Sequence, residues 1–395
     1  MILIQFLFWF CLLIVFYSYA GYPLFLWLIS LVKSAKHGIQ SGNVAPKVSL
    51  FISVYNEEAV IEEKLLNSLA LDYPKDRLEV VVISDGSADR TDEIVARYAQ
   101  QGVLLRSYEG RIGKTACLNN AAPLAKGEII VFSDANSKYD REAIKRLVSH
   151  FSDPHIGFVT GGTKYISEDD GKMLDSIGIY SKIEKATKRL ESRTGSCVGA
   201  DGAIFAIRKS LYQPLQSVDI NDFVIPLNII RKGFRGILDE NAFCIEKIAK
   251  GTKGEFNRQV RITNRTIRAV VNQRDLLNPF QYGFFAFELA SHKLCKLLVP
   301  FFLLSAFILN LFLLRQGTLY IAAFFVQLSL YGLSALGHWG WLKDFSRLIS
   351  IAHTFVVVNV AILTGWIKYM KGDTYTTWTT AREGLGNNKP SMGVK

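Results

Sequence analysis

The sequence predicts an α/β domain with a mixed, mainly parallel sheet, flanked by transmembrane helices. Three observations support this fold class. Charged residues are absent from long stretches near both ends of the 395-residue chain. The residues between these stretches alternate strand-like and helix-like patterns, which is the order of a parallel sheet covered on both faces. Polar and acidic residues recur where the predicted strands end, and such positions share one edge of a parallel sheet.

Four uncharged, apolar stretches are close to or above the ~20 residues that cross a bilayer as a helix. They are Ile2–Val32, Leu297–Leu314, Gln316–Leu342 and Leu348–Ile367. We therefore expect an N-terminal transmembrane anchor (residues 1–33), a soluble domain (34–278), an amphipathic interfacial helix (279–295), a C-terminal region of about three transmembrane helices (296–370) and a polar tail (371–395).

The first apolar stretch is expected to stay as an anchor, because it lacks a basic n-region and exceeds the ~7–15 apolar residues of a signal peptide. Lys33, Lys36 and Lys47 follow it, and basic residues favour the cytoplasmic side of a membrane. The soluble domain is therefore expected in the cytoplasm. If the soluble domain is cytoplasmic, three further spans would put the C-terminal tail on the other side of the membrane, although the tail is basic. Either one apolar stretch is re-entrant, or the first stretch turns back at Gly21–Pro23.

Composition excludes several classes of protein. The formal net charge is +11, which either solvation beside a membrane or the binding of phosphate-rich ligands explains. The basic residues are scattered and form no groove-reading motif, so no nucleic-acid partner is expected. The five cysteines form no C-x-x-C pair, which argues against zinc and dithiol chemistry and fits a reducing compartment.

The first half of the soluble domain alternates strand-like and helix-like patterns. Apolar, β-rich runs predict strands, and apolar residues at helical spacing predict helices. The expected strands are 48–55, 80–84, 103–108 and 129–133, and the expected helices are 57–70, 89–101 and 115–125.

The second half is less regular. We expect strands at 156–166 and 203–208 and helices at 172–193, 221–232 and 256–273. Residues 279–294 are aromatic on one side and polar on the other, which is typical of a helix at a membrane interface. The alternative is a helix packed in the soluble core.

Polar groups at three strand ends predict a ligand site. Asn56–Glu57 follow the first strand, Asp85 the second, and Asp134–Asn136 the fourth. In open α/β sheets, ligands bind beyond the carboxyl ends of the strands. We therefore expect these side chains to face one site.

Each candidate residue has a structural alternative. Asp134 and Asn136 suit a hard cation held partly by substrate phosphates, or the cap of the next helix. Asp85 suits a base or ribose, or an Asx-turn or helix cap. Lys114 follows a glycine turn and suits a diphosphate, but a P-loop would need glycine where Tyr108 stands. No G-x-G-x-x-G motif is present, which disfavours a dinucleotide oxidoreductase.

The carboxylate of Asp222 suits a general base that takes a proton from an acceptor hydroxyl, although Asn221–Asp222 would also cap a helix. The arginines Arg258 and Arg261, with Arg265 nearby, suit a clamp on a diphosphate or a solvated surface.

The order of these motifs resembles family 2 glycosyltransferases with a GT-A fold over roughly residues 45–275. The motifs are Val48–Glu58, Asp85–Ser87, Gly113–Lys114, Asp134–Asn136, Gly199–Ile204 and Asn221–Asp222. With its flanking apolar segments, the chain is similar to the membrane-bound branch, which includes synthases of hyaluronan, cellulose and poly-N-acetylglucosamine.

The resemblance implies an inverting transfer of sugar from a nucleotide-sugar donor, with UDP the expected carrier, to a glycan or lipid-linked acceptor for cell-surface polysaccharide or glycolipid synthesis. It also implies an integral protein of a bacterial inner membrane, with the lipid bilayer as a partner. The oligomeric state is left open.

The resemblance also implies a role for each motif residue. Tyr55, Asn56, Glu57 and Asp85 would contact the nucleotide, and Lys114 would lie near it. Asp134 and Asn136 would hold Mg²⁺ or Mn²⁺, Asp134 would also contact the donor, and Asp222 would be the catalytic base. The acceptor or the diphosphate would be contacted by Gly199, Ala200, Asp201, Gly202, Asn221, Arg258 and Arg261.

Two departures from the family pattern matter. The second acid of the Asp-x-Asp motif is Asn136, which makes metal dependence less certain than in the family. The Gln-x-x-Arg-Trp motif of processive synthases is replaced by Arg258–Ile262, without tryptophan, which weakens the expectation of polymerisation. Trp378 and Arg382 belong either to a loop that closes over the site or to an ordinary tail.

The alternative function is a catalytically silent membrane protein that keeps the fold and binds a nucleotide or a lipid. Retention of Asp85, Asp134 and Asp222 together favours the enzyme. A transporter has little support, because its spans would need polar groups at the middle of the membrane, and Asn310 and Asn359 are weak evidence for such groups.

Overall fold

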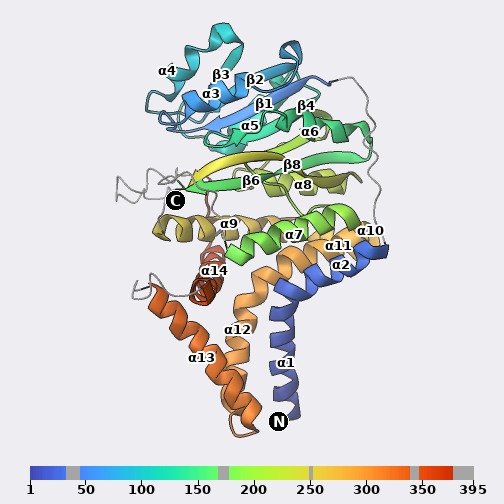
Figure 1. Cartoon of the computed structure of the whole chain (residues 1–395), viewed down its shortest axis with the longest axis vertical. Coiled ribbons are helices and arrows are strands. Elements are labelled where there is room, and N and C mark those ends of the chain that lie inside the picture. Colours follow the sequence, from blue (N-terminus) through green and yellow to red (C-terminus); the bar gives the residue numbers. More distant parts are fainter. Residues whose placement is uncertain (33–44, 168–177, 249–251, 339–346, 377–395) are drawn as a thin grey trace. The chain divides into compact units, whose positions relative to one another are not determined.

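A computed structural model describes residues 1–32, 45–167, 178–248, 252–338 and 347–376 (Figure 1). The chain forms two compact units. The sheet unit contains residues 38–173, 199–258 and 374–395, and the helical unit contains residues 1–37, 174–198 and 259–373.

The sheet unit is built on an eight-stranded sheet in its described part, with the strand order β3-β2-β1-β4-β7-β6-β8-β5. The strands are β1 (Val48–Val54), β2 (Leu78–Ser84), β3 (Val103–Ser107), β4 (Ile129–Asp134), β5 (Lys138–Tyr139), β6 (Ile156–Ser167), β7 (Ile204–Arg208) and β8 (Arg235–Ile248). β1 to β4 pair in parallel, whereas β7 runs antiparallel to β4 and β6. The predicted mixed, mainly parallel sheet is therefore confirmed.

The predicted convergence of strand ends follows from the register of the sheet. Val54 pairs with Ser84, and Ser53 pairs with Asp134. The residues that follow β1 and β2 and the last residue of β4 therefore lie at one edge. Ile204, at the start of β7, pairs with Ser133 and brings the loop before β7 to the same edge.

Both faces of the central strands are buried, as the continuous apolar runs predict. On one face, β1 contributes Leu50 and Ile52 to a core shared with residues of the helices. On the other, the Phe132 ring stacks on Phe205 at 4.5 Å and meets the edge of Phe51 at 6.1 Å. The helices of this unit are α3 (Ile61–Leu69), α4 (Thr91–Ala96), α5 (Lys114–Ala121), α6 (Ala143–Ser149) and α8 (Asn221–Arg231).

The helical unit contains long apolar helices. Its elements are α1 (Ile2–Phe16), α2 (Tyr22–Val32), α7 (Gly178–Thr194), α9 (Thr252–Asn272, in this unit from residue 259), α10 (Pro279–Tyr282), α11 (Phe284–Leu289), α12 (Cys295–Leu313), α13 (Thr318–His338) and α14 (Arg347–Met370). Short π-helical stretches, Tyr17–Gly21 and Ala290–Leu294, join α1 to α2 and α11 to α12.

Four helical segments in the described part are long and apolar enough to cross a membrane. They are Ile2–Val32, Phe284–Leu313, Thr318–Leu336 and Ile351–Met370. The second begins within the expected interfacial helix, because α11 continues into α12. An interfacial position for residues 279–295 stays a prediction.

A buried charged network joins three helices of this unit. The two ring nitrogens of His292 lie 2.6 Å and 2.7 Å from carboxylate oxygens of Glu191 and Glu184. Lys296 donates to Glu184 at 2.6 Å, and the Tyr22 hydroxyl donates to Glu191 at 2.9 Å. Buried charges are tolerated only when they are paired in this way, so the network fixes the packing of α2, α7 and the helix that carries His292.

Candidate active site

The loops after β1 and β2 hold each other through Asn56. Its φ of 51° is left-handed, a conformation that asparagine tolerates better than most residues. The Ala88 N–H donates to Asn56 Oδ1 at 2.8 Å, and the Asn56 N–H donates to the Ser87 hydroxyl at 3.2 Å. The Glu57 N–H donates to Thr91 Oγ1 at 2.8 Å. The side chain of Asn56 therefore shapes the loop, and its expected contact with a nucleotide stays a prediction.

The loop after β2 also packs closely on the glycine turn that precedes α5. Gly86 has a φ of +69°, and a Cβ atom there would lie 2.5 Å from the Gly110 carbonyl oxygen. Only glycine combines this backbone conformation with this approach. The two loops consequently form one surface at the edge of the sheet.

Asp85 lies fully buried at the end of β2, with 0% of its surface exposed. Its Oδ1 accepts hydrogen bonds from the Gly113 N–H at 2.9 Å and from the Cys117 thiol at 3.5 Å. Burial, and then the charge of Asp85, raise the pKa of the Cys117 thiol, which therefore stays protonated and donates.

The second carboxylate oxygen of Asp85, Oδ2, is buried and has no hydrogen-bond partner among the described residues. An unsatisfied buried acceptor is costly, so this oxygen is suited to an N–H or O–H group of a ligand. The Asx-turn and helix-cap alternatives do not account for it. The Ser87 N–H donates to the Ser84 hydroxyl, and Asp89, not Asp85, accepts from the N–H of Thr91 at the start of α4.

Lys114 and Asp134 connect α5 to the end of β4. Lys114 Nζ donates to Asp134 Oδ1 at 2.7 Å. Lys114 is the first residue of α5, where backbone N–H groups and the helix dipole also favour an anion. Asp134 does not cap the next helix, because α6 begins at Ala143. A cation and a carboxylate therefore stand side by side where a diphosphate and its metal would meet.

Arg111 is a site residue to which the sequence assigned no role. Its guanidinium lies 3.5 Å from the centroid of the Tyr55 ring. Such stacking makes a flat cationic platform beside Asp85 and the glycine turn. The available signal was an arginine inside the glycine turn that leads to Lys114.

Asp201 supports the loop before β7. Its Oδ2 accepts from the N–H and the hydroxyl of Thr163 at 3.1 Å and 2.8 Å, and its Oδ1 accepts from the Ala203 N–H at 3.1 Å. Oδ2 thus holds the loop against β6, and Oδ1 fixes the backbone of the loop itself. The expected contact of Asp201 with an acceptor stays a prediction, and this geometry gives the residue a supporting role.

Asp222 lies in the first turn of α8, against the loop before β7 that contains Gly199 and Gly202 (the glycine loop). The N-cap of α8 is Ile220, and no side chain caps the helix, so capping does not explain Asn221–Asp222. The Ala200 N–H donates to the Asp222 carbonyl oxygen at 2.8 Å. A Cβ atom at Gly202 would lie 2.7 Å from Asp222 Oδ2, and one at Gly199 would lie 3.1 Å from the Phe223 ring. The glycine loop therefore wraps the start of α8 and faces the Asp222 carboxylate.

Glu246, on β8, is a buried acid that the sequence did not identify. It accepts a hydrogen bond from the Ser137 hydroxyl, directly after the Asp134–Asn136 turn. Burial and the nearby charge of Asp134 raise the pKa of Glu246 to about 7, while the charge of Arg258 acts in the opposite direction. Arg258 is therefore close to this end of the sheet. Arg261 belongs to the helical unit, and its expected role stays a prediction.

The C-terminal segment also reaches the glycine turn. Gly113 has a φ of +93°, and a Cβ atom there would lie 2.7 Å from the Thr376 carbonyl oxygen. Trp378 and Arg382, the residues proposed for a closing loop, lie outside the described residues.

The residues around Asp134 fit a divalent cation that shares its ligands with a substrate. Asp134 Oδ1 is held by Lys114, while Oδ2 makes no hydrogen bond to the described part of the chain. Asn136 supplies an amide oxygen two residues later. Within the described ranges, no three acidic, histidine or cysteine side chains are grouped to hold a metal by themselves. Such a donor set suits Mg²⁺ or Mn²⁺, which take further ligands from phosphates.

Residues 49–215 match the family described as Glycosyl transferase family 2. Residues 49–215 form a family 2 glycosyltransferase domain. The matched segment contains β1 to β4 and the Asp85, Lys114 and Asp134 constellation, and it ends before Asp222.

Curated relatives of this family 2 domain include synthases named for different products. One is a beta-monoglucosyldiacylglycerol synthase from Synechocystis sp., 34% identical over 28% of this chain and 24% of its own. Another is a poly-beta-1,6-N-acetyl-D-glucosamine synthase from Staphylococcus aureus, 25% identical over 54% of this chain and 53% of its own. The chain thus spans at most about half the length of these two relatives.

A solved structure shares the fold over nearly the whole chain. It is a mannosyltransferase from Pyrobaculum calidifontis in complex with GDP-Man and Mn²⁺. The TM-score is 0.66 at 22% sequence identity, and the alignment covers 93% of this chain and 99% of that one. The predicted GT-A fold of the family 2 domain is therefore confirmed.

Proposed function

We propose that the chain transfers a sugar, with inversion at the anomeric carbon, from a nucleotide-sugar donor to a hydroxyl of a glycan or lipid-linked acceptor. One observation carries the proposal. The Asp85–Gly113 and Lys114–Asp134 contacts connect the ends of β2 and β4 through the start of α5. The register of β7 with β4 brings the loop before β7 to the same edge of the sheet, and Gly202 in that loop lies next to Asp222. Donor groups and a candidate base therefore belong to one unit.

The donor side is assigned by chemistry. Asp85 Oδ2 accepts a hydrogen bond from the base or the ribose, and the platform of Arg111 and Tyr55 lies against the nucleotide. Lys114 neutralises charge on the diphosphate from the start of α5. We keep UDP as the expected carrier and note that the mannosyltransferase of similar fold was solved with GDP-Man.

Asp134 and Asn136 hold the divalent cation. The bound cation supplies positive charge to the departing nucleoside diphosphate. Glu246 and Lys64 fix the backbone after this motif, because both bond to Ser137, one at its hydroxyl and one at its carbonyl oxygen. The two contacts keep the Asp134–Asn136 turn from shifting when a cation binds.

Asp222 accepts the proton of the acceptor hydroxyl. The acceptor oxygen then forms a bond to the anomeric carbon while the bond from that carbon to the diphosphate oxygen breaks on the opposite side. Because the leaving group is a diphosphate, charge neutralisation by Lys114 replaces a general acid. A single displacement of this kind inverts the configuration of the sugar.

The acceptor class follows from the relatives and the apolar helices. Relatives of the domain are named for a diacylglycerol glycolipid and for a β-1,6-linked polysaccharide. Four helical segments are suited to a bilayer, so a lipid-linked or membrane-extruded acceptor is within reach of the chain. We place the protein in a bacterial inner membrane with the sheet unit in the cytoplasm, where nucleotide sugars are made.

The test is nucleotide release by the purified full-length protein. UDP- and GDP-sugars are supplied with glycan, lipid or water as acceptor, with Mn²⁺, with Mg²⁺, or after chelation. We expect release that needs an acceptor and a divalent cation. Asp222→Asn should lower kcat ~10²–10⁴-fold, the usual contribution of a general base, with donor affinity nearly unchanged.

Asp134→Ala should weaken the binding of donor and metal together. Asp219→Asn is the matched control, because it makes the same change three residues before Asp222, in a loop where the carboxylate accepts from the Gln216 N–H. Donor binding without turnover for every acceptor would support the catalytically silent alternative. Full turnover by Asp222→Asn would remove the assignment of the base.

A further inference from the structure

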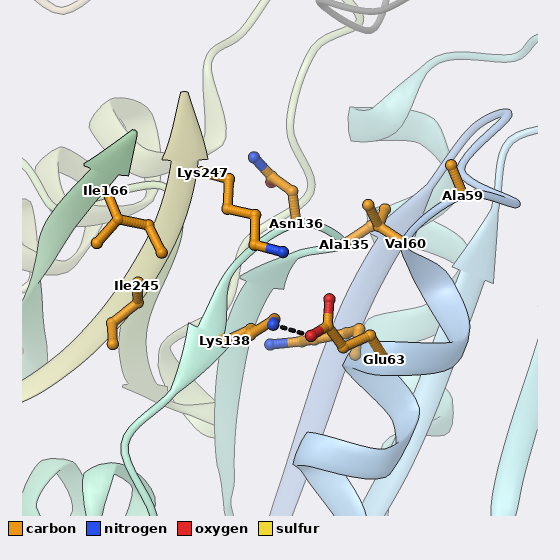
Figure 2. A pocket seen from close by; sticks show the side chains of 10 residues that line it. Ala59, Val60, Glu63, Ala135, Asn136, Lys138, Ile166, Ile245 and Lys247 are labelled. Carbon is orange, nitrogen blue, oxygen red and sulfur yellow. Dashed lines mark hydrogen bonds and ion pairs between the residues drawn. The ribbon is translucent and has the colours of Figure 1, made fainter. Parts of the chain in front are cut away.

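A polar cavity lies beside the Asp134–Asn136 turn, the proposed metal motif. Its volume is about 300 Å³, and its lining comes from the start of α3, the turn after β4, β5, β6 and β8 (Figure 2). Asn136 belongs to this lining, whereas Asp85, Lys114 and Asp222 do not. The cavity is therefore distinct from the donor contacts and meets the Asp134–Asn136 turn at Ala135 and Asn136.

The lining carries an excess of positive charge. Lys64, Lys138 and Lys247 contribute three ammonium groups, and Glu63 contributes the single carboxylate. Glu63 pairs with Lys138. Lys247 forms no ion pair within the described part of the chain, and Figure 2 shows its side chain directed toward the Lys138–Glu63 pair. Lys64 and Lys247 are thus not neutralised by an ion pair within the described part of the chain.

Lys64 is the buried member of this group, with 1% of its surface exposed. Its ammonium donates to the Ser137 carbonyl oxygen and lies 4.1 Å from the centroid of the Tyr139 ring. Burial lowers the pKa of Lys64 to about 8. Lys64 forms no ion pair within the described part of the chain, although the charges of Asp134 and Glu246 oppose the effect of burial on its pKa.

Lys64, Lys138 and Lys247 line one small cavity, so like charges lie close together there. Like charges at close range destabilise a folded protein, and a bound anion would remove this cost for all three lysines at once. The volume lies at the lower end of the ~300–1,000 Å³ of ligand pockets, which favours a small anion over a nucleotide sugar.

We propose that this cavity is a binding site for a small anionic group, phosphate or carboxylate, held by Lys64, Lys138 and Lys247 and separate from the diphosphate of the donor. The anion is either free in solution or carried by a small sugar. Anion binding itself does not depend on the proposed function.

A coupling between the two sites follows from Asn136 and rests on the proposed function. An occupant of the cavity contacts the residue that serves the metal. Because coupling between ligands is reciprocal, an anion that shifts the affinity for Mn²⁺ and donor must have its own affinity shifted by the same factor.

The experiment measures anion binding, not turnover. Inorganic phosphate is titrated by calorimetry into the full-length protein, with the donor site saturated by UDP and the ionic strength held constant with chloride. We expect one saturable site. Lys247→Gln should weaken phosphate about tenfold or more, the loss expected for one charge-assisted hydrogen bond. Lys145→Gln is the matched control, because Lys145 is 64% exposed on α6 and pairs with Asp72 outside the cavity.

Further arms separate the two sources and guard against misfolding. Glucose 6-phosphate and glucuronate, each compared with glucose, test an anion carried by a sugar, and phosphate tests a free anion. Lys247→Glu supplies a carboxylate from the protein itself, so it should abolish phosphate binding and raise the melting temperature. Absence of saturable binding for every anion, or unchanged binding in Lys247→Gln and Lys247→Glu, would overturn the proposal. Binding without any effect on Mn²⁺ affinity would remove only the coupling.

Discussion

The substitution Gly202→Ala tests the assignment of Asp222 through a residue that carries no functional group. A Cβ atom at position 202 would lie 2.7 Å from Asp222 Oδ2, whereas ordinary contact begins at 3.4 Å. The carboxylate must therefore move by about 0.7 Å. Misplacement of a catalytic group by ~1 Å costs about 10²-fold in rate, so we expect kcat to fall roughly 10- to 100-fold.

The same substitution should barely change stability. The atom that must move is the end of a side chain, and the φ of Gly202 is not left-handed. We expect the free energy of unfolding to change by less than about 1 kcal/mol and the affinity for the nucleotide to stay the same. The assay is nucleotide release under saturating donor, with the melting temperature and UDP affinity measured in parallel.

A double-mutant cycle decides whether the effect passes through Asp222. If it does, Gly202→Ala should cost almost nothing in an Asp222→Asn background, because the base is already lost. Equal losses in the two backgrounds would show that the methyl group disturbs something else. Wild-type kcat for Gly202→Ala would refute the placement of the base beside the glycine loop.

Two other predictions concern the donor loops. Gly86→Ala should destabilise the protein by more than about 2 kcal/mol, because a left-handed φ costs roughly 1–2 kcal/mol and the new Cβ meets the Gly110 carbonyl oxygen. Gly102 has a similar φ and open space around it, so Gly102→Ala should carry only the cost of the left-handed backbone. Equal melting temperatures of the Gly86→Ala and Gly102→Ala variants would contradict this. Arg111→Lys should weaken the nucleotide about threefold to tenfold through loss of stacking on Tyr55, while Arg106→Lys on exposed β3 should not, as a UDP titration would show.

The sequence was sufficient to predict the strands at the centre of the sheet. β1, β2 and β4 are short apolar runs with buried residues on both faces, and that pattern is local. The convergence of Asp85 and Asp134 followed from it, because parallel neighbours end at the same edge.

Elements that depend on distant partners were harder to predict. β8 carries acidic residues among apolar ones, and its pairing with β6 is interrupted by register shifts near Ile156 and Thr160. It was not predicted, and Glu246 was therefore not recognised as a neighbour of the Asp134 motif. α3 begins at Ile61 instead of Glu57, because the N–H groups of Asn56 and Glu57 bond to the loop after β2.

The structural alternatives for single residues also depend on contacts with residues that are distant in the sequence, so the sequence could not decide between them. Capping by Asp222 was plausible until the start of α8 was seen to lack any side-chain cap. The acceptor contact of Asp201 was implied by the resemblance alone and stays a prediction. The support that Asp201 gives to its loop, through bonds to Thr163 and Ala203, depends on tertiary contacts that the sequence does not show.

The reversed direction of β7 has a consequence for how such an enzyme can diversify. Because β7 runs against β4, the segment that precedes it, not the one that follows it, arrives at the edge that carries Asp134. Under the proposed function, residues 199–232 could then vary as one contiguous segment while the earlier strands keep the nucleotide contacts. Exchanging this segment between two homologues is expected to transfer the preference for the molecule that receives the sugar and to leave the choice of activated sugar behind.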